Sequence, residues 1–230
     1  MIPLLAPSIV IVDIDAGIDP AEVARTAAAL TRQVLEHFAP AWGVLAAVRA
    51  ATASAPARAG EWRLELRKVP TIDGALGYHD EQPDGTPILY VFPELCAQDG
   101  DAWSSCASHE ILEALADPLL RRCVQLPDGR IAALEVCDQC EAQSYEIDGV
   151  AVSDFNLPSN FEPSGAASET FDYLGLQKSA FEVLEGGYAQ VYDPSKGWTQ
   201  LGAQRSYRTK VRELGLGRGN RRKLGKVLAA

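Results

Sequence analysis

The chain of 230 residues lacks an apolar run approaching the about 20 residues that a membrane-spanning helix needs. Its apolar start, MIPLLAPSIVIVDIDAG, also lacks the basic n-region and the cleavage pattern of a secretory signal peptide, so we interpret it as a first strand. Cysteine is scarce: five are present, and an odd count in a chain of this size favours reduced thiols. These features predict a cytoplasmic protein that does not contact a membrane.

Three nucleotide-binding or catalytic motifs are missing as well. There is no G-x-x-x-x-G-K-[ST] loop and no G-x-G-x-x-G turn, so nucleotide binding has no support. There is no G-x-S-x-G elbow, which removes the usual serine hydrolase motif. Any catalytic chemistry must therefore come from other residues.

What the chain does contain is enough apolar sequence for one core and an uneven charge. Hydrophobic residues make up 47% and charged residues 23%, which is typical of a globular domain. We expect one domain over residues 1–203 and a basic, Gly/Arg-rich tail over residues 204–230. The tail carries nine basic residues and one acidic residue, Glu213, which gives it a net charge of +8. Because the whole chain has a net charge of −10, the remainder carries −18. Such a tail can dock on nucleic acid, on an acidic neighbouring subunit or on its own domain.

The order of apolar segments predicts an α+β fold rather than a regular βαβ series. Asp19-Pro20 predicts the N-cap and first position of a helix that ends just before Pro40. The alanine-rich segment 46–60 is typical of a surface loop or a weak helical turn, and the alternation over 62–69 predicts a half-exposed strand. We expect further strands at residues 8–15, 74–79 and 87–93, and hairpins turning at 127–129 and 148–149.

One predicted helix carries the sequence ASHEILEALADP and ends at Pro118. Residues four apart lie on the same face of a helix, so His109 and Glu113 project together. Imidazole and carboxylate are both zinc ligands, and Glu110 is placed to take a proton from a metal-activated water, as in the related H-E-x-x-H helix. The alternative is an ordinary amphipathic core helix, which its apolar residues would form without any metal.

A catalytic zinc ion usually has three protein ligands, so a third is needed. Asp117 continues the stripe but lies roughly 12 Å from His109 along the helix axis, too far to reach the same ion. The acidic segment EVCDQCE supplies better candidates. We favour Asp138, followed by Glu141 and Glu135.

Five segments, GALGYHD, SHEILEALADP, LEVCDQCEA, YEIDGVAVSDFNLPSNFEP and EGGYAQVYDP, resemble a group of bacterial and phage-associated zincin-like proteins. The similarity spans about residues 74–194, more than half of the chain. It implies a zincin-like mixed sheet with an active-site-type helix, preceded in order by strand, helix, strand, edge strand and strand. The chain departs from the zincin H-E-x-x-H helix because Glu113 stands in place of the second histidine.

In a zincin-like layout the strand at 74–79 lines the substrate cleft. His79 and Tyr78, or the neighbouring backbone, are then expected to contact a bound peptide by strand addition. The alternative is a surface histidine near a turn. Cys137-x-x-Cys140, with Cys123, leaves open a structural metal site or a redox pair.

Two functions follow from these patterns. The first is a zinc-dependent peptidase-like hydrolase with a peptide or protein substrate. The second is an assembly protein of a phage-type particle, in which the zincin-like fold is retained and the tail binds neighbouring copies, another subunit or nucleic acid. The tail residues assigned to that binding are Arg205, Arg208, Arg218, Arg221, Arg222 and Lys223.

Overall fold

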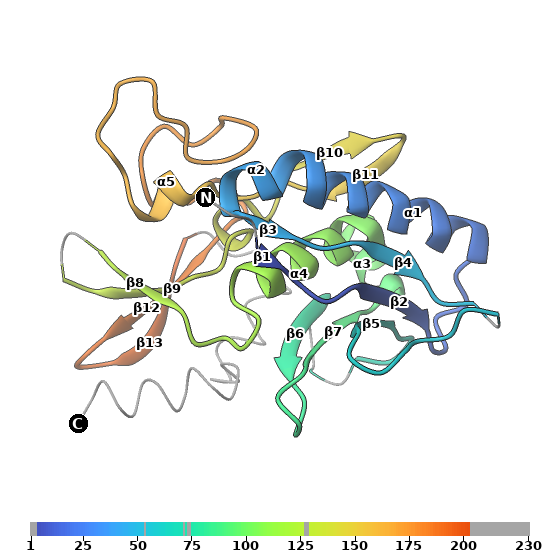
Figure 1. Cartoon of the computed structure of the whole chain (residues 1–230). Helices are drawn as coiled ribbons and strands as arrows, with labels where there is room; N and C mark the ends of the chain where they lie inside the picture. The colour runs from blue at the N-terminus through green and yellow to red at the C-terminus, as the bar shows by residue number, and fades with distance from the viewer. Residues whose placement is uncertain (1–3, 53, 71, 73–74, 127–128, 203–230) are drawn as a thin grey trace.

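The computed structural model describes residues 4–52, 54–70, 72, 75–126 and 129–202, which form a mixed α+β fold with several sheets (Figure 1). The helices are α1 (Pro20–Arg32), the π-helix η1 (Gln33–Phe38), α2 (Ala39–Trp42), α3 (Pro93–Asp99), α4 (Trp103–Ala116), the 3-10 helix η2 (Asp138–Cys140) and α5 (Pro158–Phe161). The strands are β1 (Leu4–Leu5), β2 (Ile9–Asp13), β3 (Val44–Leu45), β4 (Val48–Ala50), β5 (Trp62–Leu66), β6 (Gly77–Glu81), β7 (Pro87–Val91), β8 (Cys123–Gln125), β9 (Ile131–Ala133), β10 (Ser144–Ile147), β11 (Val150–Ser153), β12 (Ala189–Asp193) and β13 (Gly197–Leu201).

The largest sheet has five strands in the order β4-β2-β5-β7-β6. All neighbouring strands in it are parallel except β6, which runs antiparallel to β7 at one edge. His79 on β6 pairs with Leu89 on β7, and Tyr78 pairs with Tyr90. Because successive side chains of a strand point to opposite faces, His79 and Tyr78 lie on different faces of this sheet.

Helices α1 and α4 lie on the same side of the five-stranded sheet (Figure 1). The core between them contains fully buried side chains from both layers, including Ile11 and Leu64 of the sheet, Leu30 of α1 and Leu112 of α4. The β10–β11 hairpin covers α4 from above, where Ser104 Oγ of the helix donates to the carbonyl of Ala151 at 2.8 Å. Helix α4 is therefore enclosed between a sheet and a hairpin.

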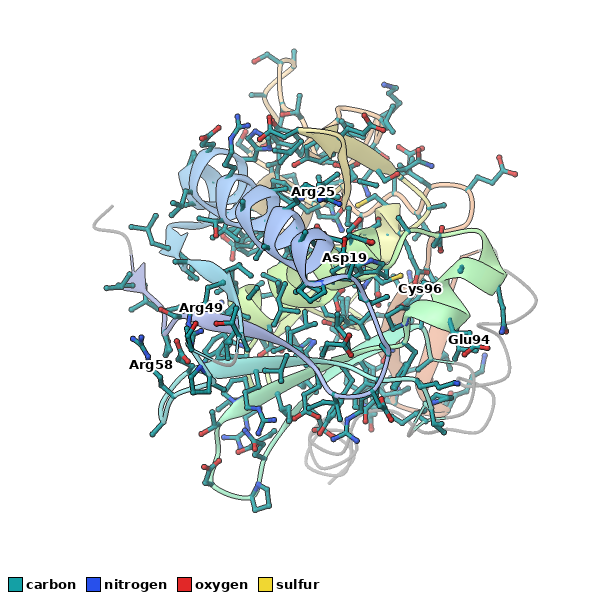
Figure 2. All side chains as sticks on the ribbon, turned by 90° about the vertical axis from the view of Figure 1, so that its right-hand side faces the viewer. Asp19, Arg25, Arg49, Arg58, Glu94 and Cys96 are labelled. Carbon is teal, nitrogen blue, oxygen red and sulfur yellow. The ribbon has the colours of Figure 1, made fainter. Side chains whose placement is uncertain are left out.

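The expected start of α1 is confirmed, but its expected end is wrong. Asp19 caps the helix by accepting a hydrogen bond from the backbone N–H of Ala21, and it lies at the helix start in Figure 2. The helical path does not stop before Pro40 but continues through η1 into α2, which ends at Trp42 with Gly43 as its C-cap. The wider π turn before α2 places Pro40 in a first helical turn, where a missing backbone N–H costs little.

Two further expectations about this region are corrected. The segment expected to be a loop contains β4, which pairs with β2. Strand β5 is central in the sheet rather than half exposed, and Glu65 on it is buried. Its buried carboxylate is compensated by two ion pairs, at 2.7 Å with Arg63 and at 2.6 Å with Arg67, one on each side along the strand.

The two expected hairpins are confirmed by the β8–β9 and β10–β11 pairs, and residues 127–128 of the first expected turn lie outside the described residues. Strands β12 and β13 add to β9 and complete a four-stranded antiparallel sheet with a small core of Leu126, Ala132 and Val191. The tail and all six of its assigned binding residues lie outside the described residues.

Candidate metal centre

Helix α4 supplies two of the three residues of the candidate metal centre, His109 and Glu113. Twelve of its fourteen residues are buried, because the sheet lies on one side and the β10–β11 hairpin on the other. The helix ends as expected: Asp117 is its C-cap and Pro118 follows. One turn apart on this helix, His109 Nε2 lies 3.2 Å from Glu113 Oε1.

Asp138 joins this pair from a distant part of the chain. Its Oδ1 lies 3.4 Å from His109 Nε2, and the ligand atoms of His109, Glu113 and Asp138 all lie within 4.8 Å of one another. All three side chains are at least nine-tenths buried. The structure therefore brings together the three residues that sequence reasoning ranked first for metal binding.

Asp138 reaches the site because the short helix η2 is held by the segment 184–188. The backbone N–H of Tyr188 donates to the Asp138 carbonyl at 2.9 Å, and that of Leu184 donates to the Gln139 carbonyl at 2.9 Å. Gly187 lies between these two bonds, and a Cβ there would be 2.7 Å from the Gln139 carbonyl carbon. Only glycine permits this approach of the two backbones, so Gly187 contributes indirectly to the position of Asp138.

The donor set fits a zinc ion in both chemistry and spacing. Two ligands of a tetrahedral zinc ion, each about 2.0–2.2 Å from it, are roughly 3.3–3.5 Å apart. The two distances from His109 Nε2 are 3.2 and 3.4 Å. Glu113 Oε1 also accepts a bond from the Cys137 backbone N–H at 3.4 Å, which is the kind of outer contact that orients a ligating carboxylate.

The two carboxylates also act on the imidazole itself. Burial disfavours the charged imidazole, but the carboxylates of Glu113 and Asp138 outweigh burial and raise the pKa of His109 well above its usual value. A metal ion at this place competes with a proton for His109, since only the neutral imidazole is a ligand.

Glu110 points towards the edge strand β6 rather than along the line from His109 to Asp138. Its Oε2 lies 3.4 Å from His79 Nδ1. A Cβ at Gly77 would lie 3.0 Å from Glu110 Cγ, so the glycine leaves room for this carboxylate. His79, Glu110 and Glu113 form a second buried group whose ligand atoms lie within 4.8 Å of one another.

Several other predicted site residues lie elsewhere. Glu135 is buried and Glu141 half-buried, and neither belongs to a metal-capable group within the described part of the chain. Asp117 also belongs to no metal-capable group among the described residues, and its carboxylate accepts the backbone N–H groups of Arg121 and Arg122 at 3.0 and 2.8 Å, which closes the helix end.

The two residues expected to line a cleft are separated by the sheet. Tyr78 packs on Tyr90 with ring centroids 4.8 Å apart, on the face opposite α4. His79 is fully buried on the α4 face, so it is not a surface histidine and does not face a bound peptide directly. The pattern of apolar and polar residues in β6 does not predict that His79 is buried, because histidine counts as a polar residue in such a pattern.

The cysteines do not form the alternative metal site among the described residues. Cys137 and Cys140 are both buried, and burial raises the pKa of each thiol well above its usual value. A thiol in this state is a poor nucleophile and a poor ligand, because both roles require the thiolate. All five cysteines are free of disulfides, as expected.

Comparisons of the chain with protein-family models, with curated proteins and with solved structures return no match. None of the helices in the described ranges has the length and apolar character needed to cross a membrane. The chemistry of the site therefore follows from its own residues.

Proposed function

We propose that the protein is a zinc-dependent hydrolase of the zincin-like type, with His109, Glu113 and Asp138 as the metal ligands. The observation that carries the proposal is the approach of one imidazole nitrogen to two carboxylates, at 3.2 and 3.4 Å, inside the protein. One nitrogen and two oxygen donors form a three-ligand set that leaves one zinc position for water or substrate. When bound, zinc polarises a substrate carbonyl and lowers the pKa of a water molecule at the open position.

Glu110 is the residue best placed to serve as general base. It follows His109 in the sequence, is 4% exposed, and its charge acts on His109. A buried carboxylate beside the ligands can accept a proton from the attacking water and return it to the leaving group. His79, on its far side, keeps the carboxylate oriented.

The arrangement of the five-stranded sheet supports a peptide or protein substrate. The order of strand, helix, strand, strand, antiparallel edge strand, strand and H-E helix agrees with the order that the zincin resemblance implies, with one additional strand before the edge. Strand β6 forms one edge of this sheet, and Gly77 on it lies next to Glu110. An extended peptide that adds to this edge would pass next to the carboxylate.

The metal content of the purified full-length protein tests the proposal. We expect stoichiometric zinc in the wild type and one zinc ion fewer per chain in His109→Gln, whereas His37→Gln keeps the wild-type content because His37 contacts Tyr145 away from the site. Hydrolysis of a quenched fluorescent peptide mixture should be lost in Glu110→Gln. A wild-type protein that binds no metal on zinc loading would refute the proposal, and metal without hydrolysis would indicate a structural ion instead.

A further inference from the structure

A second cluster of donor atoms lies next to the first, between α4 and β6. His79, Glu110 and Glu113 are 0%, 4% and 0% exposed, and their ligand atoms lie within 4.8 Å of one another. Glu113 belongs to both clusters, since it also faces His109. Two of the three histidines of the chain thus lie on either side of one buried glutamate.

The hydrogen bonds of His79 determine which of its nitrogens is available to a cation. Nε2 lies 3.2 Å from the backbone carbonyl of Asp117, and a carbonyl only accepts, so Nε2 carries the hydrogen. Nδ1 is then the nitrogen that a cation can reach, and it faces Glu110 Oε2 at 3.4 Å. Metal-ligating histidines usually donate their other ring N–H to a carbonyl or carboxylate in this way.

The surrounding backbone is shaped to bring these groups together. Helix α4 ends at Ala116, so the carbonyl of Asp117 lies beyond the helix, where it accepts from the backbone N–H of Leu120 and from His79. Gly77, two residues before His79 on the same face of β6, has Glu110 Cγ where a Cβ would need space. A side chain at Gly77 would push β6 and Glu110 apart.

An imidazole lone pair and a carboxylate at this distance are stable only with a proton or a cation between them. Burial strengthens the requirement, because the carboxyl groups of Glu110 and Glu113 are both removed from water. One nitrogen and two carboxylates are donors that zinc and manganese accept.

We propose that His79, Glu110 and Glu113 bind a second divalent cation, with the carboxylate of Glu113 shared between the two clusters. The inference rests on the proposed hydrolase function and changes the role of Glu110 from general base to ligand. Hydrolases with paired cations use them to stabilise the attacking and the leaving oxygen atoms together. With two cations, the protein could also hydrolyse substrates whose reaction needs charge stabilisation on both sides of the scissile bond.

Counting ions per chain tests this directly. Full-length protein is stripped with a chelator, loaded with Zn²⁺ or Mn²⁺, passed through a desalting column and measured by elemental analysis, with Mn²⁺ spin coupling as a second readout. We expect two ions per chain and a coupled spin signal in the wild type. Glu110→Gln, which preserves side-chain shape, should bind one ion and lose the coupling, as should His79→Gln.

The controls separate this inference from the proposed function. His37→Gln, outside both clusters, should still bind two ions, and His109→Gln should lose the coupled signal while retaining the second site. One ion per chain in the wild type, unchanged in Glu110→Gln, would refute the second site and leave a proton between His79 and Glu110. No bound ion in the wild type would refute both proposals, and circular dichroism of each variant verifies that it is folded.

Discussion

Gly187 provides a test of the metal centre that leaves all of its ligands in place. In Gly187→Ala, the new Cβ would lie 2.7 Å from the carbonyl carbon of Gln139 and 3.0 Å from the carbonyl oxygen of Asp138. Gly187 has no positive φ, so alanine adds steric overlap without backbone strain from an unfavourable φ. The substitution therefore acts on the distance between the segment 184–188 and η2.

The size of the displacement follows from ordinary contact distances. Two carbons pack at about 3.5–4.0 Å, so the segments must separate by roughly 0.8 Å or more. Metal ligands tolerate about 0.2 Å, and changes in the groups that orient them typically cost about 10–100-fold in affinity. We expect a loss of this size in zinc affinity, together with a loss of about 1–3 kcal/mol in the free energy of unfolding from overpacking.

Competition with a fluorescent zinc chelator measures the affinity, and urea unfolding measures the stability. Gly149→Ala is the matched control, because Gly149 has a φ of +75° and nothing within 4 Å of its added Cβ. Strain there should cost about 1–2 kcal/mol of stability and leave zinc affinity unchanged. Unchanged zinc affinity in Gly187→Ala would show that Asp138 is not held as a ligand by this contact.

Three further outcomes are expected. Gly77→Ala should displace Glu110, because the added Cβ would lie 3.0 Å from its Cγ. We expect hydrolysis to fall at least tenfold while zinc at His109 is retained. Unchanged hydrolysis would contradict the placement of Glu110. Burial and a hydrogen bond to Asp172 raise the pKa of Asp154 from 3.8 to about 8. Between pH 3.8 and about 8 the folded protein keeps this proton, whereas the unfolded chain has released it. The free energy of unfolding should therefore fall as the pH rises through this range, by at most about 1.4 kcal/mol per pH unit. Urea titrations from pH 5 to 8 measure the slope, and Asp154→Asn should flatten it. Zinc at about 100 times its Kd should stabilise the wild type by about 2.7 kcal/mol, or roughly 5–10 °C in Tm, and His109→Gln should lose most of this shift in a thermal melt.

Local sequence patterns predicted much of the framework because the signals are carried by neighbouring residues. The N-cap at Asp19, the helix end at Pro118 and the two hairpins each depend on a few adjacent residues, and all are present in the structure. The pairing of His109 with Glu113 also follows from helical spacing alone.

Patterns that depend on distant partners misled the same reasoning. The alternation of β5 is typical of a half-exposed strand, yet flanking strands and two arginine ion pairs bury Glu65. His79 was expected near a cleft, yet it is fully buried because α4 packs over that face of β6.

The sequence by itself determined that one helix presents an imidazole and two carboxylates, and that an acidic segment follows it. Only the tertiary structure decided that Asp138, and neither Glu135 nor Glu141, reaches His109. The physical reason is that helical spacing is set by covalent geometry over four residues. The position of η2 instead depends on backbone contacts with a segment almost fifty residues later, where Gly187 leaves the space for them.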